Sequence, residues 1–194
     1  MHYKFIDLPK LKEINMKYWK RIKMKDLETI QRKSLKYIKN NRDKFVDAPF
    51  SPINFKSFVE AVPEFMSAFE EYDITPVQVS AYIMYSNSDG AAHKDYLTDS
   101  ARINIPIINC ENSWTNFYKL VVPGTEPKVV VNSKGQPYIS YSPEDIVLED
   151  RVQIIEPTII RPLEIHSIEM DDTRVPRITL TVCTRPVPEF LLMD

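Results

Sequence analysis

The residues best suited to chemistry in this chain are its three histidines, His2, His93 and His166. His93 begins the sequence His-Lys-Asp, so in an extended segment the side chains of His93 and Asp95 project from the same face. His166 lies in the separate segment EIHSI and can bring a second imidazole to the same ion. Two imidazoles and one carboxylate, with other coordination positions left open, form a typical site for non-haem Fe(II). We therefore predict that His93, Asp95 and His166 are metal ligands and the catalytic centre.

A strand with an arginine on its polar face follows His166. Its residues alternate: Arg177, Thr179 and Thr181 point one way, and Ile178, Leu180 and Val182 point the other. An arginine with a hydroxyl two residues further on suits a buried carboxylate, because the guanidinium binds it in bidentate fashion and the threonine adds a donor. The alternative is that Arg177 forms a salt bridge with Asp171 or Asp172.

Helices are expected to precede these strands, up to about residue 74. Asp7 and Pro9 are typical of a helix start, and Leu11, Ile14, Tyr18 and Ile22 would form one apolar stripe. Asp26 opens a second helical pattern that runs to the polar sequence NNRD. Asn54 is placed to cap a third helix, which Pro63 ends before a further turn through Phe69.

From residue 75 onward the apolar residues alternate as in β-strands. We expect strands over 76–85 and 101–108, a hairpin of KVVV and PYISY with its turn around Lys134–Gly135, and short strands at VQII, TIIR, EIHSI and RITLTVCT. Several short strands after a helical block indicate a sandwich or barrel backed by helices. With only 3 Gly, the chain has no glycine-rich phosphate loop, which excludes P-loop and dinucleotide-binding folds.

The order His-x-Asp, distal His and Arg-x-Thr resembles that of the Fe(II)- and 2-oxoglutarate-dependent oxygenases. The stretch HKDYLTDSARINIPIINCENSWTNFY is similar to the prolyl and aspartyl/asparaginyl hydroxylase branches, and the similarity covers roughly residues 78–185. It implies an α+β, mostly β fold: a double-stranded β-helix (a cupin-like jelly roll) with N-terminal helices packed on one sheet. The chain would form a single domain, 1–194, with a helical part at 1–74 and the β-helix core at 75–186.

The resemblance also implies roles for individual residues. His93, Asp95 and His166 would bind Fe(II), and Arg177, helped by Thr179, would pair with the distal carboxylate of 2-oxoglutarate. Tyr82 is a second candidate for that carboxylate. The remaining candidates are less specific: Asn104, with Arg102 on the same strand face, for contact with co-substrate or substrate, and Trp114 for substrate.

The activity that follows is that of a dioxygenase that hydroxylates an unactivated C–H bond, with 2-oxoglutarate and O₂ as co-substrates and ascorbate as a stimulant. The favoured substrate is a prolyl or other amino-acid side chain in a protein or peptide. Alternatives are an oxygenase acting on a small molecule or on nucleic acid, a cupin-like metalloenzyme without 2-oxoglutarate, and an inert β-helix that serves as a binding or structural module.

Composition places the chain among globular proteins, with 43% hydrophobic and 27% charged residues. Residues 1–45 hold 14 Lys and Arg against 5 Asp and Glu, and the remainder holds 11 against 22. Nucleic acid could contact this basic stretch, but solvated helix faces are the favoured explanation. Cys110 and Cys183 are too few for a disulfide framework. No long apolar run or signal-peptide core is present, so we expect a cytoplasmic protein without a membrane partner.

Overall fold

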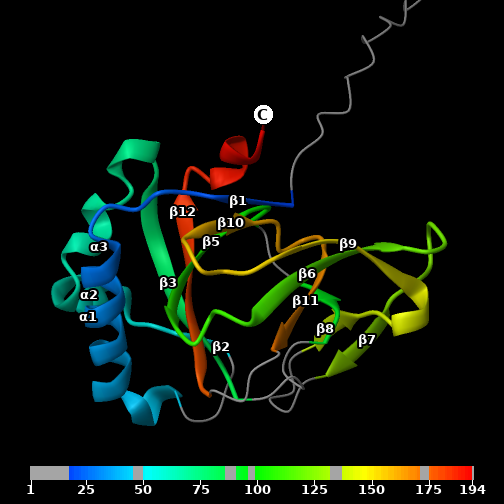
Figure 1. Ribbon diagram of the computed structural model, residues 1–194, viewed down its shortest axis with the longest axis horizontal. Helices are drawn as coiled ribbons and strands as arrows, with labels where there is room; N and C mark the ends of the chain where they lie inside the picture. The colour runs from blue at the N-terminus through cyan, green and yellow to red at the C-terminus, as the bar shows by residue number, and fades with distance from the viewer. Residues whose placement is uncertain are drawn as a thin grey trace, which may run out of the picture.

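Two six-stranded sheets, with every strand pair antiparallel, make up most of the described part of this computed structural model (Figure 1). The structure describes residues 18–45, 50–85, 91–95, 99–131, 137–170 and 175–193. Sheet A has the order β1 (Trp19–Arg21), β10 (Thr158–Ile160), β5 (Arg102–Ile108), β12 (Arg177–Arg185), β3 (Thr75–Met84) and β2 (Phe50–Pro52). Sheet B has the order β7 (Lys128–Val131), β8 (Pro137–Ser140), β4 (His93–Lys94), β11 (Ile165–Met170), β6 (Ser113–Leu120) and β9 (Ile146–Val152).

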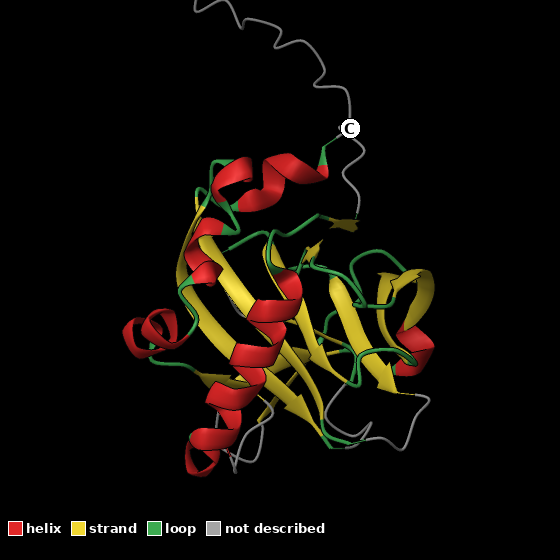
Figure 2. Cartoon of the chain, turned by 60° about the vertical axis from the view of Figure 1, so that its left-hand side comes forward, coloured by secondary structure: helices red, strands yellow, loops and turns green. Residues whose placement is uncertain are grey.

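The helices lie on the outer face of sheet A, and Figure 2 shows α1 lying across its strands. They are α1 (Leu27–Asn40), α2 (Phe55–Ala61) and α3 (Glu64–Ser67). The described residues also form the short 3₁₀ turns η1 (Arg42–Phe45), η2 (Glu70–Tyr72), η4 (Pro143–Asp145), which contacts β9 of sheet B, and η5 (Pro188–Leu192). The Asn54 side chain caps α2 by accepting a hydrogen bond from the Ser57 amide at 3.0 Å, as expected. Asp26 precedes α1 in a left-handed conformation and makes no side-chain cap.

The main hydrophobic core lies between sheet A and the helices. The strands contribute alternate residues to it: Val79, Ala81, Ile83, Ile103, Ile105, Ile159, Ile178, Leu180 and Val182. Ile30 and Ile38 of α1, Phe58 of α2 and Phe65 of α3 cover them from the other side. Apolar burial on this face therefore stabilises the fold. The opposite face of sheet A can then carry polar side chains.

The opposite face of sheet A is polar and turns toward sheet B. Because strand residues alternate, this face carries the remaining side chains of the same strands. Its polar members include Arg102, Asn104, Thr158, Arg177 and Thr179, all buried, together with the half-buried Thr181. A face of this composition between two sheets is unusual for a purely structural core, because buried polar groups need partners.

Two expected elements differ in the structure. The stripe that includes Tyr18 and Ile22 is not helical there, because Trp19–Arg21 pairs with β10 at the edge of sheet A, where free backbone groups outweigh the local apolar spacing. A strand was expected at VQII, residues 152–155. The observed strand lies earlier in the chain, at Ile146–Val152, where it pairs with β6. Asp7, Leu11 and Ile14, and the turn at Lys134–Gly135, lie outside the described residues.

The other expected strands are present, and α1, α2 and α3 occupy the positions that the sequence indicates. The β7–β8 hairpin is also present, paired from Lys128 to Val131. None of the helices in the described ranges is long and apolar enough to cross a membrane.

Candidate metal centre

The structure brings His93, Asp95 and His166 together, although they come from distant parts of the chain. One potential ligand atom from each residue lies within 4.8 Å of the others. His93 Nε2 is 3.4 Å from Asp95 Oδ1, and the centroids of the two imidazole rings are 4.5 Å apart. Metal–ligand bonds to such groups are about 2.0–2.2 Å long, so ligand atoms on one ion lie roughly 3 Å apart. Small side-chain movements are enough to reach that spacing.

Backbone carbonyls orient both imidazoles. His93 Nδ1 lies 2.6 Å from the Ala91 oxygen, and His166 Nδ1 lies 2.9 Å from the Glu164 oxygen. In each ring Nδ1 therefore donates its proton to a carbonyl, which leaves the Nε2 lone pair as the ligand atom. Metal-bound histidines typically show this arrangement, because the second hydrogen bond fixes the tautomer and the ring orientation. The donor set fits a divalent metal.

The charges within the cluster favour a neutral His166 and an ionised Asp95. Burial, and then the neighbouring charge of His93, lowers the pKa of His166 to about 4. Burial opposes ionisation of Asp95, but its hydrogen bond with His93 and the positive charges of His93 and Arg102 hold its pKa below the ordinary value. Burial also disfavours protonation of His93, yet hydrogen bonds to Asp95 and Ala91 raise its pKa overall.

Neighbouring strands position each ligand. His93 is the register partner of His166 on β11 and of Ser140 on β8, so the two-residue strand β4 is held from both sides. The Asp95 amide donates to the Pro162 oxygen at 3.0 Å, which fixes the backbone just after β4. The sequence predicts that His93 and Asp95 share one face. The pairing of β4 with β11 places His166 beside them.

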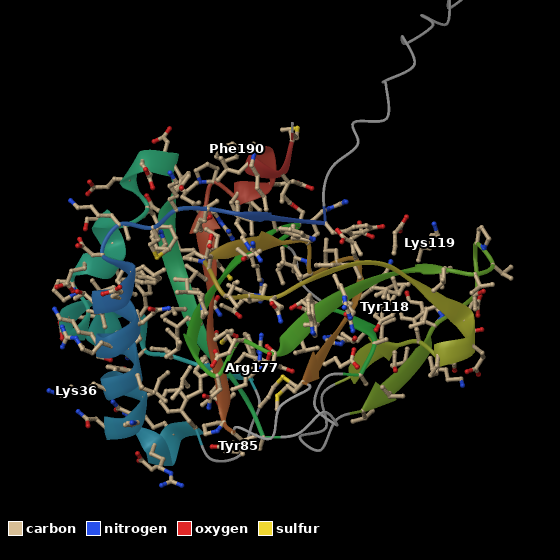
Figure 3. All side chains as sticks on the ribbon, in the orientation of Figure 1. Lys36, Tyr85, Tyr118, Lys119, Arg177 and Phe190 are labelled. Carbon is tan, nitrogen blue, oxygen red and sulfur yellow. The ribbon has the colours of Figure 1, made fainter. Side chains whose placement is uncertain are left out.

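Arg177 is enclosed between the sheets with a side chain only 1% exposed (Figure 3). Its Nε donates to Ser113 Oγ at 2.8 Å, and Nη1 lies 4.0 Å from the sulfur of Met84. Among the described residues no carboxylate pairs with it, and Asp171 and Asp172 lie outside them. Burial lowers the pKa of Arg177, whereas the charges of Cys110 and Tyr82 act in the opposite direction.

The other candidate residues divide between the two faces of the sheets. Thr179 is buried on the Arg177 face and is the register partner of Tyr82. Asn104 shares that face, and its Oδ1 accepts a hydrogen bond from Thr181 at 2.9 Å. Trp114 points the other way, from the outer face of sheet B, where Arg151 lies 4.0 Å from its ring centroid. The structure therefore places Trp114 away from the cluster.

Three residues beside the candidate site were not identified from the sequence. Ser113 holds Arg177, and Phe117 is the register partner of His166. Tyr18 stacks on Phe117 with centroids 5.2 Å apart and donates its hydroxyl proton to Glu149. Burial and Glu149 raise the pKa of Tyr18. The aromatic and β-branched residues of SWTNFY were the available signal for a strand here.

A groove of about 430 Å³ lies on the outer face of sheet B and is lined by Asn116, Tyr118, Ser167 and Glu169, among others. These residues alternate with Phe117 and His166, so the groove is on the opposite side of the sheet from the cluster of His93, Asp95 and His166. It does not belong to the candidate metal centre.

No family model matches the chain, and no curated protein matches it. A solved structure described as "Non-heme monooxygenase, ThoJ-Ni complex" matches with a TM-score of 0.50 at 11% sequence identity. The match covers 85% of this chain and 72% of that chain. At this identity the likeness concerns the fold alone, and it agrees with the mostly antiparallel β architecture of the two sheets.

Proposed function

We propose that this protein is an Fe(II)- and 2-oxoglutarate-dependent oxygenase that hydroxylates an unactivated C–H bond. The observation that carries the proposal is that two features lie together in the polar space between the two sheets. The donor atoms of His93, Asp95 and His166 gather there in a set that fits a metal ion, and the buried Arg177 lacks a carboxylate among the described residues. A buried guanidinium is expected to meet an anion, because an unpaired charge in the interior is destabilising.

The order of the strands supports a double-stranded β-helix. Strands β3, β5, β10 and β12 belong to sheet A, and β4, β6, β9 and β11 belong to sheet B. Along the chain they pass repeatedly between the two sheets, and the β7–β8 hairpin is an insertion before β9. This connectivity is that of a jelly roll built from eight strands. It brings β4 and β11, which carry the ligands, side by side.

The spacing between the cluster and Arg177 suits a short dicarboxylate. Arg177 reaches Ser113, whereas His166 pairs with Phe117, four residues further along β6 and therefore roughly 13 Å away. A molecule that ligates the metal with one end and meets Arg177 with the other fits this interval. Thr179 lies beside Arg177 on the same strand face and can add a hydroxyl donor.

His93, Asp95 and His166 would hold the metal, and Arg177 would orient the co-substrate. Bound Fe(II) supplies the activation of O₂ that hydroxylation of a C–H bond requires. In the net reaction 2-oxoglutarate loses CO₂ to become succinate, with one oxygen atom entering succinate and the other entering the substrate. Tyr18 and Phe117 pack beside His166 and help to exclude water from it. An amino-acid side chain, in a protein, a peptide or a small molecule, is the proposed substrate class.

Succinate formation tests this proposal directly. The protein is incubated in air with Fe(II), ascorbate and 2-oxoglutarate, and succinate is measured for the wild type, His166→Ala and Arg177→Met. We expect slow succinate formation by the wild type, none above background by His166→Ala, and a strongly raised KM for 2-oxoglutarate in Arg177→Met. Arg42→Met is the matched control, because Arg42 is exposed on η1.

Two results would contradict the proposal. Absence of both succinate formation and anaerobic metal binding in the wild type would favour an inert module. Metal binding with no response to 2-oxoglutarate would instead point to a cupin-like metalloenzyme in which Arg177 is structural.

A further inference from the structure

Arg102, the first residue of β5, is a second buried arginine on the polar interior. It is 6% exposed and faces the same way as Asn104, toward sheet B. Its register partner on β10 is Ile160, and the next pair along β5 joins Ile103 to Val182 of β12. Both neighbouring strands therefore enclose the base of its side chain.

The guanidinium of Arg102 makes no hydrogen bond and no ion pair with any described residue, and its Nε is fully enclosed without a partner. The two terminal nitrogens are not among the fully enclosed unpaired atoms, so they border accessible space. An arginine carries five N–H donors in a fixed planar fork. A buried cation without an anionic partner is destabilising, and among the described residues no carboxylate forms an ion pair with Arg102.

Other arginines near the site do have acidic partners. Arg185 pairs with both carboxylate oxygens of Asp99, each at 3.3 Å. Arg161 pairs with Glu164 at 2.9 Å. The contrast shows that carboxylates are available in this region and that Arg102 is not paired with them.

Arg102 lies at the metal end of the interior, away from Arg177. Its partner Ile160 packs in one apolar cluster with Phe117, which is the register partner of His166. The charge of Arg102 also contributes to the lowered pKa of Asp95. Along β12, the step from Arg177 to Cys183, which lies beside Arg102, is roughly 20 Å. The two arginines therefore extend from well-separated positions on sheet A.

We propose that Arg102 binds a carboxylate of the molecule to be hydroxylated, and that the substrate is therefore a small carboxylic acid of about amino-acid size. This inference rests on the proposed function. The guanidinium fork matches a carboxylate with two parallel hydrogen bonds, which fixes the orientation of the bound acid as well as its position. The depth of Arg102 favours a small molecule over a folded protein surface. Arg177 then serves the co-substrate and Arg102 the substrate.

Binding of acetate to the metal-free, full-length protein tests the site without any turnover. Acetate has two candidate sites, Arg102 and Arg177, and saturation-transfer NMR reports on both. We compare the wild type with Arg102→Met, Arg177→Met, the double variant and the exposed control Arg42→Met. Each single variant should lose part of the acetate signal, the double variant nearly all of it, and the control none. An Arg102→Met signal equal to that of the wild type, with the double variant equal to Arg177→Met, overturns the inference.

The link to substrate is tested with Fe(II), 2-oxoglutarate and a panel of free L-amino acids, hydroxy acids and short mono- and dicarboxylic acids. At least one acid should accelerate succinate formation by the wild type. In Arg102→Lys, which keeps the charge and loses the planar fork, the KM for that acid should rise roughly ten- to hundredfold. The KM for 2-oxoglutarate should stay unchanged. If no acid accelerates turnover, or if Arg102→Lys alters only the KM for 2-oxoglutarate, the substrate assignment is wrong.

The two proposals fail in different ways. A wild type that forms no succinate contradicts the oxygenase, yet the acetate measurement on metal-free protein still shows whether Arg102 binds an anion. Succinate formation with normal 2-oxoglutarate kinetics, combined with an unchanged acetate signal in Arg102→Met, contradicts the Arg102 site alone. Circular dichroism of each variant separates loss of binding from loss of folding, and Arg102→Lys supplies a conservative second variant.

Discussion

The hydrogen bond from Arg177 Nε to Ser113 Oγ, 2.8 Å long, joins the first residue of β12 to the first residue of β6 across the space between the two sheets. It uses one edge of the guanidinium. Together with the approach of Nη1 to the Met84 sulfur at 4.0 Å, it fixes the orientation of the guanidinium.

Replacing Ser113 by alanine should loosen Arg177 without removing it. We expect the KM for 2-oxoglutarate to rise about fivefold to tenfold, which corresponds to roughly 1 kcal/mol for one lost hydrogen bond, with little change in kcat. Steady-state succinate formation at varied 2-oxoglutarate measures this. Ser167→Ala is the matched control, because Ser167 hydrogen-bonds to Tyr118 on the outer face of the same sheet. Equal KM values in the two variants would contradict the role of Ser113.

A divalent metal should stabilise the folded chain through His93, Asp95 and His166. At a Co(II) concentration about 100 times its Kd, the gain is about 2.7 kcal/mol. For a chain of this size that corresponds to a rise in Tm of roughly 5–10 °C. Asp95→Asn should lose the rise, and Asp43→Asn, on the exposed η1, should keep it. Thermal unfolding under argon with and without Co(II) is the measurement, and a rise in Asp95→Asn equal to that of the wild type would show that Co(II) binds elsewhere.

The metal-free protein should lose stability in mild acid because of His166. The folded chain holds the pKa of His166 at about 4, whereas an unfolded histidine titrates near its ordinary value. The unfolded state therefore takes up the proton first, and stability present above pH ~6.5 is lost as the pH falls toward 4. Between about pH 7 and pH 5 the loss amounts to about 2 kcal/mol.

Urea unfolding of the wild type and of His166→Asn at several pH values measures this loss. His93, whose pKa is raised, contributes in the opposite direction, because it gains stability from protonation as the pH falls. Since His93 is present in both proteins, the difference between them isolates His166. Parallel pH profiles for the two proteins would show that His166 is not held neutral by burial.

Tyr18 should contribute to stability mainly through its ring. Tyr18→Phe keeps the stack on Phe117 and removes the hydrogen bond to Glu149, so we expect a loss of about 0.5–1 kcal/mol. Tyr18→Ala removes the stack as well and should cost about 2 kcal/mol or more. Urea titrations give both values. A larger effect for Tyr18→Phe than expected, close to that of Tyr18→Ala, would assign the contribution to the hydroxyl group instead.

The cluster of His93, Asp95 and His166 could be predicted from the sequence because few residues compete for the role. With three histidines in the chain and Asp95 two residues after His93, alternation alone places two ligands on one face. The same alternation predicts that Arg177 and Thr179 share a face, and their register positions agree with it. The strands, α1 and the Asn54 cap follow from local patterns that the tertiary structure reinforces.

What could not be predicted depends on contacts between distant segments. Trp19–Arg21 becomes a strand only because β10 offers it an edge, and no local pattern reveals that edge. The unpaired state of Arg102 is likewise invisible in the sequence, where acidic residues are numerous. It is apparent only once Asp99 is seen to pair with Arg185. The Ser113 contact requires the relative positions of β6 and β12.

The pairing of β4 with β8 connects the backbone of His93 to a hairpin at the surface of the protein. His93 sits on a strand of two residues, one side of which is held by a hairpin whose outer strand exposes Val129 and Val131 at 70% and 64%. The exposed valines are therefore connected to the backbone of His93 by two successive strand pairings, β7 with β8 and β8 with β4.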